Sequence, residues 1–250
     1  MHEQIEVLGV KIDSLTVDTL LKRVEMFIKG GHQKIVLYVN VHCMDIASSD
    51  EEYKKLVNKA DLVYCDGFGV VLGAKVLGKS LPGRITGADW IYDLAALCQQ
   101  KQYRLFLLGG EEGVSEEASG KLKEKYPGLQ IGGYHHGYLE MKKDGPDLIN
   151  MINESRSDIL LVGFGTPMQE KMIFRHRSHL QVPVIWAVGA LMDFASGKVP
   201  RAPKWMLDNG FEWLYRFLVE PGRLWRRYLI GNSKFLFRVT KERLFKSAAR

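Results

Sequence analysis

The sequence predicts an α/β protein in which a Rossmann-like, mostly parallel sheet is flanked by helices, with a helical, basic and aromatic appendage at the C-terminus. The sheet is predicted because short apolar runs alternate with segments whose apolar residues recur at helical spacing. The appendage is predicted because residues 200–250 hold 12 Lys/Arg against 4 Asp/Glu and 10 of the 26 aromatic residues. Residues 1–199 hold 23 Lys/Arg against 25 Asp/Glu. We therefore expect an α/β domain over residues 1–199 and an appendage over residues 200–250.

Six apolar runs are short and rich enough in β-branched residues to be buried strands, at residues 5–10, 35–39, 62–64, 105–108, 159–162 and 184–188. Four segments between them are amphipathic at 3.6-residue spacing and predict helices, at residues 17–28, 88–100, 115–126 and 168–180. Because parallel sheets bind ligands at the carboxyl ends of their strands, site residues should directly follow strands.

The composition describes a globular protein, with 46% hydrophobic and 26% charged residues among 250. The three cysteines, Cys43, Cys65 and Cys98, have no CxxC spacing, which favours a reducing compartment over a disulfide or zinc framework. No signal peptide is visible at the start, and the longest apolar stretch, residues 184–192, is too short to span a bilayer. These features predict a cytoplasmic protein.

The run DILLVGFGTPMQEKM, residues 158–172, predicts a buried strand that ends in a glycine turn and opens a helix. Gly163 and Gly165 would let the backbone turn tightly, and Pro167 suits the first helical position. The free N–H groups of that helix end could then face an anion. The alternative is a tight connection without a ligand, since a GxG lacking the third glycine is a weak signal.

Three other strand ends carry polar or glycine residues: Asn40, Asp66 and the pair Gly109 and Gly110. Each has a simpler explanation by itself, because Asn and Asp cap helices and paired glycines form turns. For Asp66 alone, a helix cap is the stronger interpretation. Four such ends on one edge of a sheet favour a binding site.

Arg84 lies in a Pro/Gly loop, where its guanidinium could reach a diphosphate or simply be solvated. The histidine pairs 135–136 and 176/179 have no Cys, Asp or Glu set at metal-ligand spacing. There is also no Asp-x-Asp motif, so we expect no metal site.

These residues belong to segments that resemble the TagA/WecG/CpsF group of bacterial glycosyltransferases, glycosyltransferase family 26, over nearly the whole chain. The segments are CDGFGVV, PGRITGADW, FLLGGEEGV, GGYHHGY, DILLVGFGTPMQEKM, AVGALMDFASGKVPRAPKWM and GFEWLYRFLVEPGRLWRRYL. The resemblance implies transfer of a sugar from a UDP-sugar, of the N-acetylmannosamine type or another hexose, to a polyprenyl-diphosphate-linked saccharide. It also implies inversion at the anomeric centre, no cofactor and no metal.

The resemblance further implies roles for individual residues. Asp66 would be the general base, Arg84 and Gln169 would stabilise the departing diphosphate, and Asn40 would lie beside the sugar and phosphates. The residues expected around the nucleotide-sugar are Gly109, Gly110, Tyr138, Gly163, Phe164, Gly165, Pro167 and Asp193.

The tail combines an apolar stripe, Leu214, Phe217 and Leu218, with arginines. Such a surface suits an anionic membrane. By resemblance it would cover the active site at the inner face of the bacterial cytoplasmic membrane, and the arginines expected to reach the acceptor diphosphate or the membrane are Arg216, Arg223, Arg226 and Arg227. The alternative is that the tail packs on the main domain or on a sister subunit. A homo-oligomer is therefore also possible.

Two other functions compete with sugar transfer. A dinucleotide-dependent oxidoreductase also uses glycine turns, but no GxGxxG is complete here. A nucleic-acid-binding protein could use the basic tail, but the Trp and Leu content of the tail suits a lipid interface better. We therefore expect no nucleic-acid partner. The donor sugar, the acceptor saccharide and the pathway do not follow from the sequence.

Overall fold

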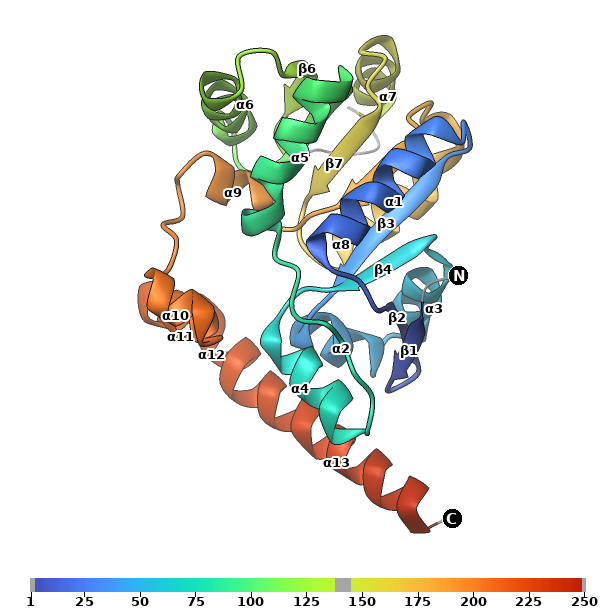
Figure 1. Ribbon diagram of the computed structural model, residues 1–250, viewed down its shortest axis with the longest axis vertical. Helices are drawn as coiled ribbons and strands as arrows, with labels where there is room; N and C mark the ends of the chain where they lie inside the picture. The colour runs from blue at the N-terminus through green and yellow to red at the C-terminus, as the bar shows by residue number, and fades with distance from the viewer. Residues whose placement is uncertain (1–2, 138–144, 249–250) are drawn as a thin grey trace.

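The computed structural model describes residues 3–137 and 145–248. Its centre is a six-stranded sheet in the order β4-β3-β8-β7-β5-β6, and every neighbouring pair is parallel. Helices lie on both sides of this sheet (Figure 1). The predicted Rossmann-like α/β fold is thus confirmed. The strands of the sheet are β3 (Lys34–Val39), β4 (Leu62–Cys65), β5 (Arg104–Gly109), β6 (Gln130–His135), β7 (Ile159–Gly163) and β8 (Val184–Ala187).

The path of the chain through the sheet creates the crevice in which a ligand would bind. From β3 the chain moves outward to β4 at one edge, and from β5 it moves outward to β6 at the other. Strands β7 and β8 then fill the space between β5 and β3. Ligands of open parallel sheets bind outside the carboxyl ends at such a reversal of strand order.

Helices lie between the strands, and four of them match the predicted helical segments. The expected catalytic part, residues 1–199, contains α1 (Val17–Lys29), α2 (Val41–Ala47), α3 (Glu51–Lys59), α4 (Phe68–Val76), α5 (Gly87–Lys101), α6 (Val114–Lys125), α7 (Gly145–Glu154), α8 (Met168–His176), a 3₁₀ turn (Arg177–His179) and α9 (Leu191–Ala195). The appendage contains α10 (Lys204–Asp208), α11 (Glu212–Val219), α12 (Pro221–Trp225), the π-helical turn η2 (Arg226–Gly231) and α13 (Asn232–Ala248).

The predicted strand at residues 5–10 is wrong, because the chain turns back in its middle. Strands β1 (Gln4–Val7) and β2 (Val10–Asp13) form a separate antiparallel hairpin. Leu8 and Gly9 have φ values of 50° and 78°, which is the backbone of a two-residue hairpin turn. The hairpin joins the main sheet through the Asp13 carboxylate, which accepts a hydrogen bond of 2.7 Å from the Val63 amide.

Buried contacts fix the strands near the site. The Trp90 ring of α5 stacks on the Trp186 ring of β8 with centroids 4.1 Å apart. Asp158, the residue before β7, accepts a hydrogen bond of 2.7 Å from the Arg104 amide and so aligns β7 with β5. The run that opens with Asp158 therefore has a structural role in addition to any ligand role.

The appendage packs against α2 and α4 of the catalytic part. Phe235 and Val239 of α13 are buried there, and a Cβ on Gly73 of α4 would lie 2.6 Å from the Phe235 ring. The Arg238 guanidinium also donates to the Asp45 carboxylate of α2 at 2.7 Å. The appendage is therefore docked on the catalytic part, and we retain residues 1–199 and 200–250 as proposed units.

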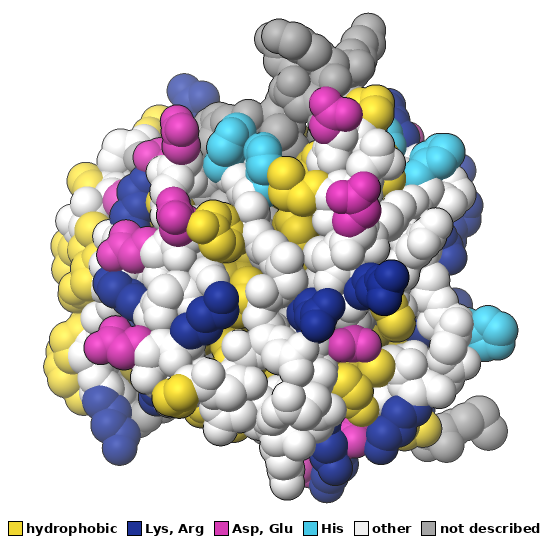
Figure 2. All heavy atoms as spheres, turned by 90° about the horizontal axis from the view of Figure 1, so that it is seen from above, with side chains coloured by type: hydrophobic (Ala, Val, Ile, Leu, Met, Phe, Trp, Pro, Cys, Tyr) yellow, Lys and Arg dark blue, Asp and Glu magenta, His cyan; other side chains and the backbone are white. Residues whose placement is uncertain are grey.

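Within the described part of the chain, no helix combines the length and the apolar character that a transmembrane span requires. Exposed large hydrophobic side chains are concentrated in the appendage, which contributes 12 of the 18 among the described residues. Figure 2 looks onto the opposite end of the molecule, near α5, α6 and α7, where acidic and basic side chains are intermixed.

Candidate active site

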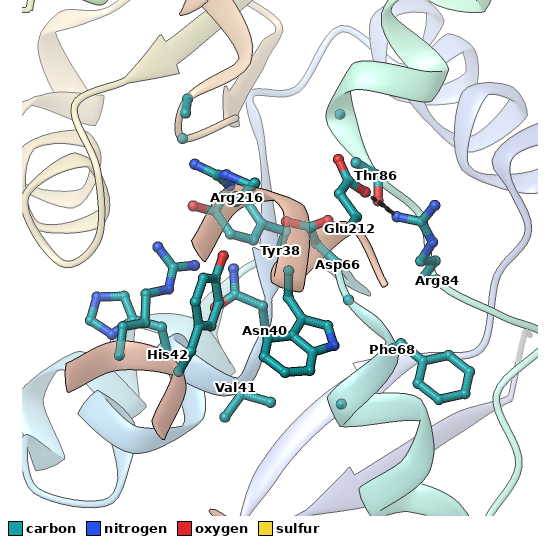
Figure 3. A pocket seen from close by; sticks show the side chains of 18 of the residues that line it. Tyr38, Asn40, Val41, His42, Asp66, Phe68, Arg84, Thr86, Glu212 and Arg216 are labelled. Carbon is teal, nitrogen blue, oxygen red and sulfur yellow. Dashed lines mark hydrogen bonds and ion pairs between the residues drawn. The ribbon is translucent and has the colours of Figure 1, made fainter. Parts of the chain in front are cut away.

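A cavity of about 450 Å³ lies at the carboxyl ends of β3, β4, β7 and β8, and the appendage forms its outer wall (Figure 3). Its polar side chains come from segments far apart in the sequence. Those residues are Tyr38, Asn40, His42, Asp66, Arg84, Thr86, Thr166, Glu212, Arg216, Arg227, Tyr228 and Asn232. The arrangement gathers carboxylates, guanidinium groups and hydroxyls in one partly enclosed space.

Asp66 follows β4 and points into this cavity (Figure 3). The residue does not cap the next helix, because Gly67 occupies the cap position of α4 and no side chain caps that end. Burial and then the negative charge of Glu212 raise the pKa of Asp66 to about 6, although Arg227, Thr86 and Arg216 act in the other direction. A carboxylate with this pKa is largely ionised at pH 7 and is a stronger base than an ordinary aspartate.

Arg84 lies in the loop between α4 and α5, and its side chain is only 18% exposed. Its Nη1 donates to the Thr86 hydroxyl at 3.0 Å and to the Glu212 carboxylate at 2.5 Å. Its Nη2 donates to the carbonyl oxygen of Leu207 at 3.2 Å. The alternative of a solvated loop arginine is therefore wrong.

Asn40 caps a helix, as the simpler interpretation expected, and it also lines the cavity, while its contact with a ligand stays a prediction. It precedes α2, and its Oδ1 accepts a hydrogen bond of 3.2 Å from the Cys43 amide. His42, in the first turn of α2, also faces the cavity. Burial, and then the charge of Arg227, lower the pKa of His42 to about 4, so its imidazole is neutral at pH 7.

The glycine turn between β7 and α8 is shaped by close packing of strand ends. A Cβ on Gly109 would lie 2.4 Å from the Gly163 carbonyl oxygen, and a Cβ on Gly163 would lie 2.5 Å from the Gly189 carbonyl oxygen. Gly165, with a φ of 81°, lines the cavity together with Thr166. Glycine is thus required here for packing and for the backbone turn.

Pro167 does not occupy the first helical position as predicted. It is the residue before α8, and its ψ of 6° differs from a helical value. The helix begins one residue later, at Met168, while the Pro167 carbonyl accepts a hydrogen bond of 3.1 Å from the Lys171 amide.

Gln169 is fully buried behind the turn and does not line the cavity. Its Oε1 accepts a hydrogen bond of 3.1 Å from the Gly189 amide, and its Nε2 donates to Glu170, Thr166 and Tyr38 at 2.9, 3.3 and 3.4 Å. Tyr38 and Thr166 do line the cavity. In this arrangement Gln169 supports the wall of the cavity, and its predicted contact with the diphosphate stays a prediction.

The predicted appendage arginines divide into two groups. Arg216 and Arg227 line the cavity, and the Arg216 guanidinium lies 5.3 Å from the centroid of the Phe194 ring. Arg226 is exposed, with its guanidinium 5.2 Å from the centroid of the Trp225 ring. The side chain of Arg223 lies outside the described part of the structure.

The other residues predicted around the nucleotide-sugar do not line this cavity. Gly109 is the last residue of β5 and Gly110 follows it, Phe164 follows β7, and Asp193 lies on α9. The two glycines and Phe164 lie at strand ends, and the Gly137 amide donates a hydrogen bond of 2.8 Å to the Gly110 carbonyl. Tyr138 is outside the described residues.

The sequence reasoning missed several cavity residues, above all Tyr38, His42, Thr86, Thr166 and Glu212. Thr86, Thr166 and Glu212 lie inside the segments that carry the family resemblance, so their position in those segments could have marked them as candidates. Among the residues that the structure describes, no three His, Cys, Asp or Glu side chains are close enough together to hold a metal ion.

Comparison with known proteins assigns the chain to a family. A model of the "Glycosyl transferase WecG/TagA/CpsF family" matches residues 5–249. The chain belongs to this family. Membership confirms the expected resemblance and makes the protein a glycosyltransferase, which excludes both competing interpretations as its primary activity.

Three curated relatives carry one name, N-acetylglucosaminyldiphosphoundecaprenol N-acetyl-beta-D-mannosaminyltransferase. The protein from Bacillus spizizenii (strain ATCC 23059 / NRRL B-14472 / W23) is 36% identical over 195 residues, 78% of this chain and 74% of the relative. The protein from Bacillus subtilis (strain 168) is 31% identical over 83% of this chain and 79% of the relative. The protein from Staphylococcus aureus (strain MRSA252) is 27% identical over 95% and 92%. This family member is thus similar to named sugar transferases over most of its length.

Proposed function

We propose that this glycosyltransferase transfers N-acetylmannosamine from a UDP-linked donor to N-acetylglucosaminyl-diphosphoundecaprenol, with inversion and without a metal or cofactor. The names of the relatives support this choice of sugar and acceptor. The observation that carries the chemistry is one cavity in which Asp66 lies among Arg84, Arg216 and Arg227. A base and several cations are what displacement of a diphosphate by an alcohol requires.

In the proposed reaction, the Asp66 carboxylate removes the proton from the acceptor hydroxyl as its oxygen bonds to the anomeric carbon. The bond between that carbon and the UDP oxygen breaks on the opposite face, so the configuration inverts and UDP leaves. Arg84 stabilises the developing charge on the UDP phosphates, helped by the backbone at Gly165 and Thr166. Asn40 contacts the sugar and phosphates.

The appendage would bring the lipid-linked acceptor to this cavity. Arg216 and Arg227 would hold the acceptor diphosphate, and Arg223 and Arg226 would extend the basic surface toward the headgroups. The exposed apolar side chains of the appendage would dock at the inner face of the cytoplasmic membrane. The supporting observation is that the outer wall of the cavity and most of the exposed apolar side chains belong to the helices of the appendage.

The test is a panel of radiolabelled UDP-sugars offered with a short-chain polyprenyl-diphosphate N-acetylglucosamine acceptor. We expect turnover with UDP-N-acetylmannosamine, release of UDP, and no loss of rate in EDTA. UDP-glucose and UDP-N-acetylglucosamine serve as control donors. Preference for another sugar would reject the proposed donor, and inactivation by EDTA with recovery on adding Mg²⁺ would reject the metal-free mechanism.

A further inference from the structure

The contact between Arg84 and Glu212 joins the catalytic part to the appendage inside the cavity (Figure 3). Glu212 opens α11 and is only 13% exposed, and its carboxylate lies 2.5 Å from the Arg84 Nη1. The Leu207 carbonyl of α10 accepts from the Nη2 of the same guanidinium. Arg84 is thus held by two groups of the appendage.

Glu212 occupies the kind of position that a phosphate oxygen would take on Arg84. A carboxylate and a phosphate both accept charge-assisted hydrogen bonds from a guanidinium in the same geometry. Nη1 also donates to Thr86, so this nitrogen has little capacity for a further acceptor while Glu212 is bound. A diphosphate that binds Arg84 through Nη1 must therefore displace Glu212.

We propose that Glu212 and the diphosphate of the nucleotide donor compete for Arg84, so that donor binding releases α11 from the catalytic part. This inference rests on the proposed function, because the diphosphate role of Arg84 belongs to it. Competition of this kind makes the position of the appendage depend on the donor, since a ligand shifts a conformational equilibrium only through contacts that differ between the two states.

The same geometry connects Glu212 to Asp66. Asp66 interacts with the hydroxyl of Thr86 and faces the charges of Glu212, Arg216 and Arg227. Thr86 in turn accepts from Arg84. Removing the charge of Glu212 should therefore change the ionisation of the base as well as the affinity for the donor, and a merely structural contact would not produce both effects.

The experiment compares wild-type protein with Glu212→Gln and with Glu220→Gln, a charge-matched control on the residue that follows α11. Titration calorimetry would measure binding of UDP, inorganic pyrophosphate and uridine. We expect Glu212→Gln to bind UDP and pyrophosphate at least about fivefold more tightly, with uridine binding and the control variant unchanged. The acid limb of kcat/KM for the donor should move to lower pH in Glu212→Gln alone.

Hydrogen exchange supplies a readout in the unmodified enzyme, in which UDP should raise the exchange of amides in residues 212–219. Equal or weaker UDP binding by Glu212→Gln, or slower exchange of those residues with UDP, would overturn the competition while leaving the proposed function in place. If UDP binds none of the three proteins, the proposed function fails and the competition fails with it.

Discussion

Asp66 combines burial, a neighbouring carboxylate and nearby guanidinium groups, and each acts on its ionisation. Burial and Glu212 favour the neutral acid, whereas Arg227, Thr86 and Arg216 favour the carboxylate. The balance leaves the pKa at about 6. At that value the side chain is mostly ionised at pH 7, as the proposed base must be, and it binds a proton more readily than an ordinary aspartate does.

We predict that Asp66→Asn lowers turnover by a factor of about 100 or more while UDP binding and the unfolding temperature stay near wild type. The wild-type kcat/KM should rise with pH through about 6, because the carboxylate is the active form and its pKa is raised to that value. Initial rates measured from about pH 4.5 to about pH 8, roughly two pH units to either side of this pKa, would check this. The exposed Asp18→Asn is the control, and near-normal turnover in Asp66→Asn would remove Asp66 from the role.

Single residues could be predicted where the sheet itself positions them. Asn40, Asp66 and Gly165 follow strands of one parallel sheet, so a correct reading of the strands brings them to the same edge. Glu212 could not be placed in the same way, because its contact with Arg84 spans 128 residues and depends on how the appendage docks. Gln169 was predicted to stabilise the departing diphosphate. In the structure its side chain forms hydrogen bonds to Tyr38 and Gly189, and the local sequence around Gln169 does not reveal these partners.

At the scale of elements, the docking of α13 depends on the small face of α4. A Cβ on Gly73 would lie 2.6 Å from the Phe235 ring and 3.5 Å from the Val239 side chain. Phe235 and Val239 are 1% and 0% exposed. Any larger residue at position 73 must therefore displace the Phe235 ring or push α13 away from α4, and either movement alters the cavity wall that Phe235 and Leu236 form.

We predict that Gly73→Ala loosens the docking of α13 by about 1–3 kcal/mol, because adding a methyl group to a tightly packed interface forces the helices apart. The measurements are hydrogen exchange of residues 232–245 and the rate of sugar transfer, with faster exchange and a slower rate expected. Gly120→Ala in α6 is the matched control, since a Cβ there meets no atom within 4 Å. Unchanged exchange at α13 in Gly73→Ala would contradict this account of the docking.

Long periodic elements were predictable, and short or glycine-containing ones were not. The four predicted helices correspond to α1, α5, α6 and α8 within a few residues. The hairpin of β1 and β2 was read as one strand because apolar residues continue through its turn. Strand β6 was missed because Gly132 and Gly133 interrupt its apolar pattern.

At the scale of the molecule, one end is suited to a membrane. Exposed Phe237, Leu244 and Phe245 lie on α13, at the end of the molecule where the chain terminates (Figure 1), with side chains 70%, 65% and 66% exposed. The appendage also holds 12 of the 35 Lys/Arg residues. Aromatic and apolar side chains beside basic ones bind anionic bilayers by partitioning and by charge together.

We predict that the triple variant Phe237→Ser, Leu244→Ser, Phe245→Ser binds anionic vesicles at least about tenfold more weakly, because three exposed apolar side chains no longer enter the interface. Co-sedimentation with phosphatidylglycerol vesicles would measure this, and the unfolding temperature should stay unchanged. Met26→Ser on α1, where the side chain is 60% exposed, is the control. Equal sedimentation of the triple variant and wild type would exclude this surface as the membrane contact.

The cavity takes its first side chain from Tyr38 and its last from Leu236, so almost the whole chain must be synthesised before the site has all its walls. The last strand of the central sheet, β8, ends at Ala187, so the sheet can be complete before α11, η2 and α13 add the outer wall of the cavity. We therefore expect a chain truncated before α13 to keep its central sheet but to transfer sugar more slowly than the full chain, because the cavity then lacks Phe235 and Leu236.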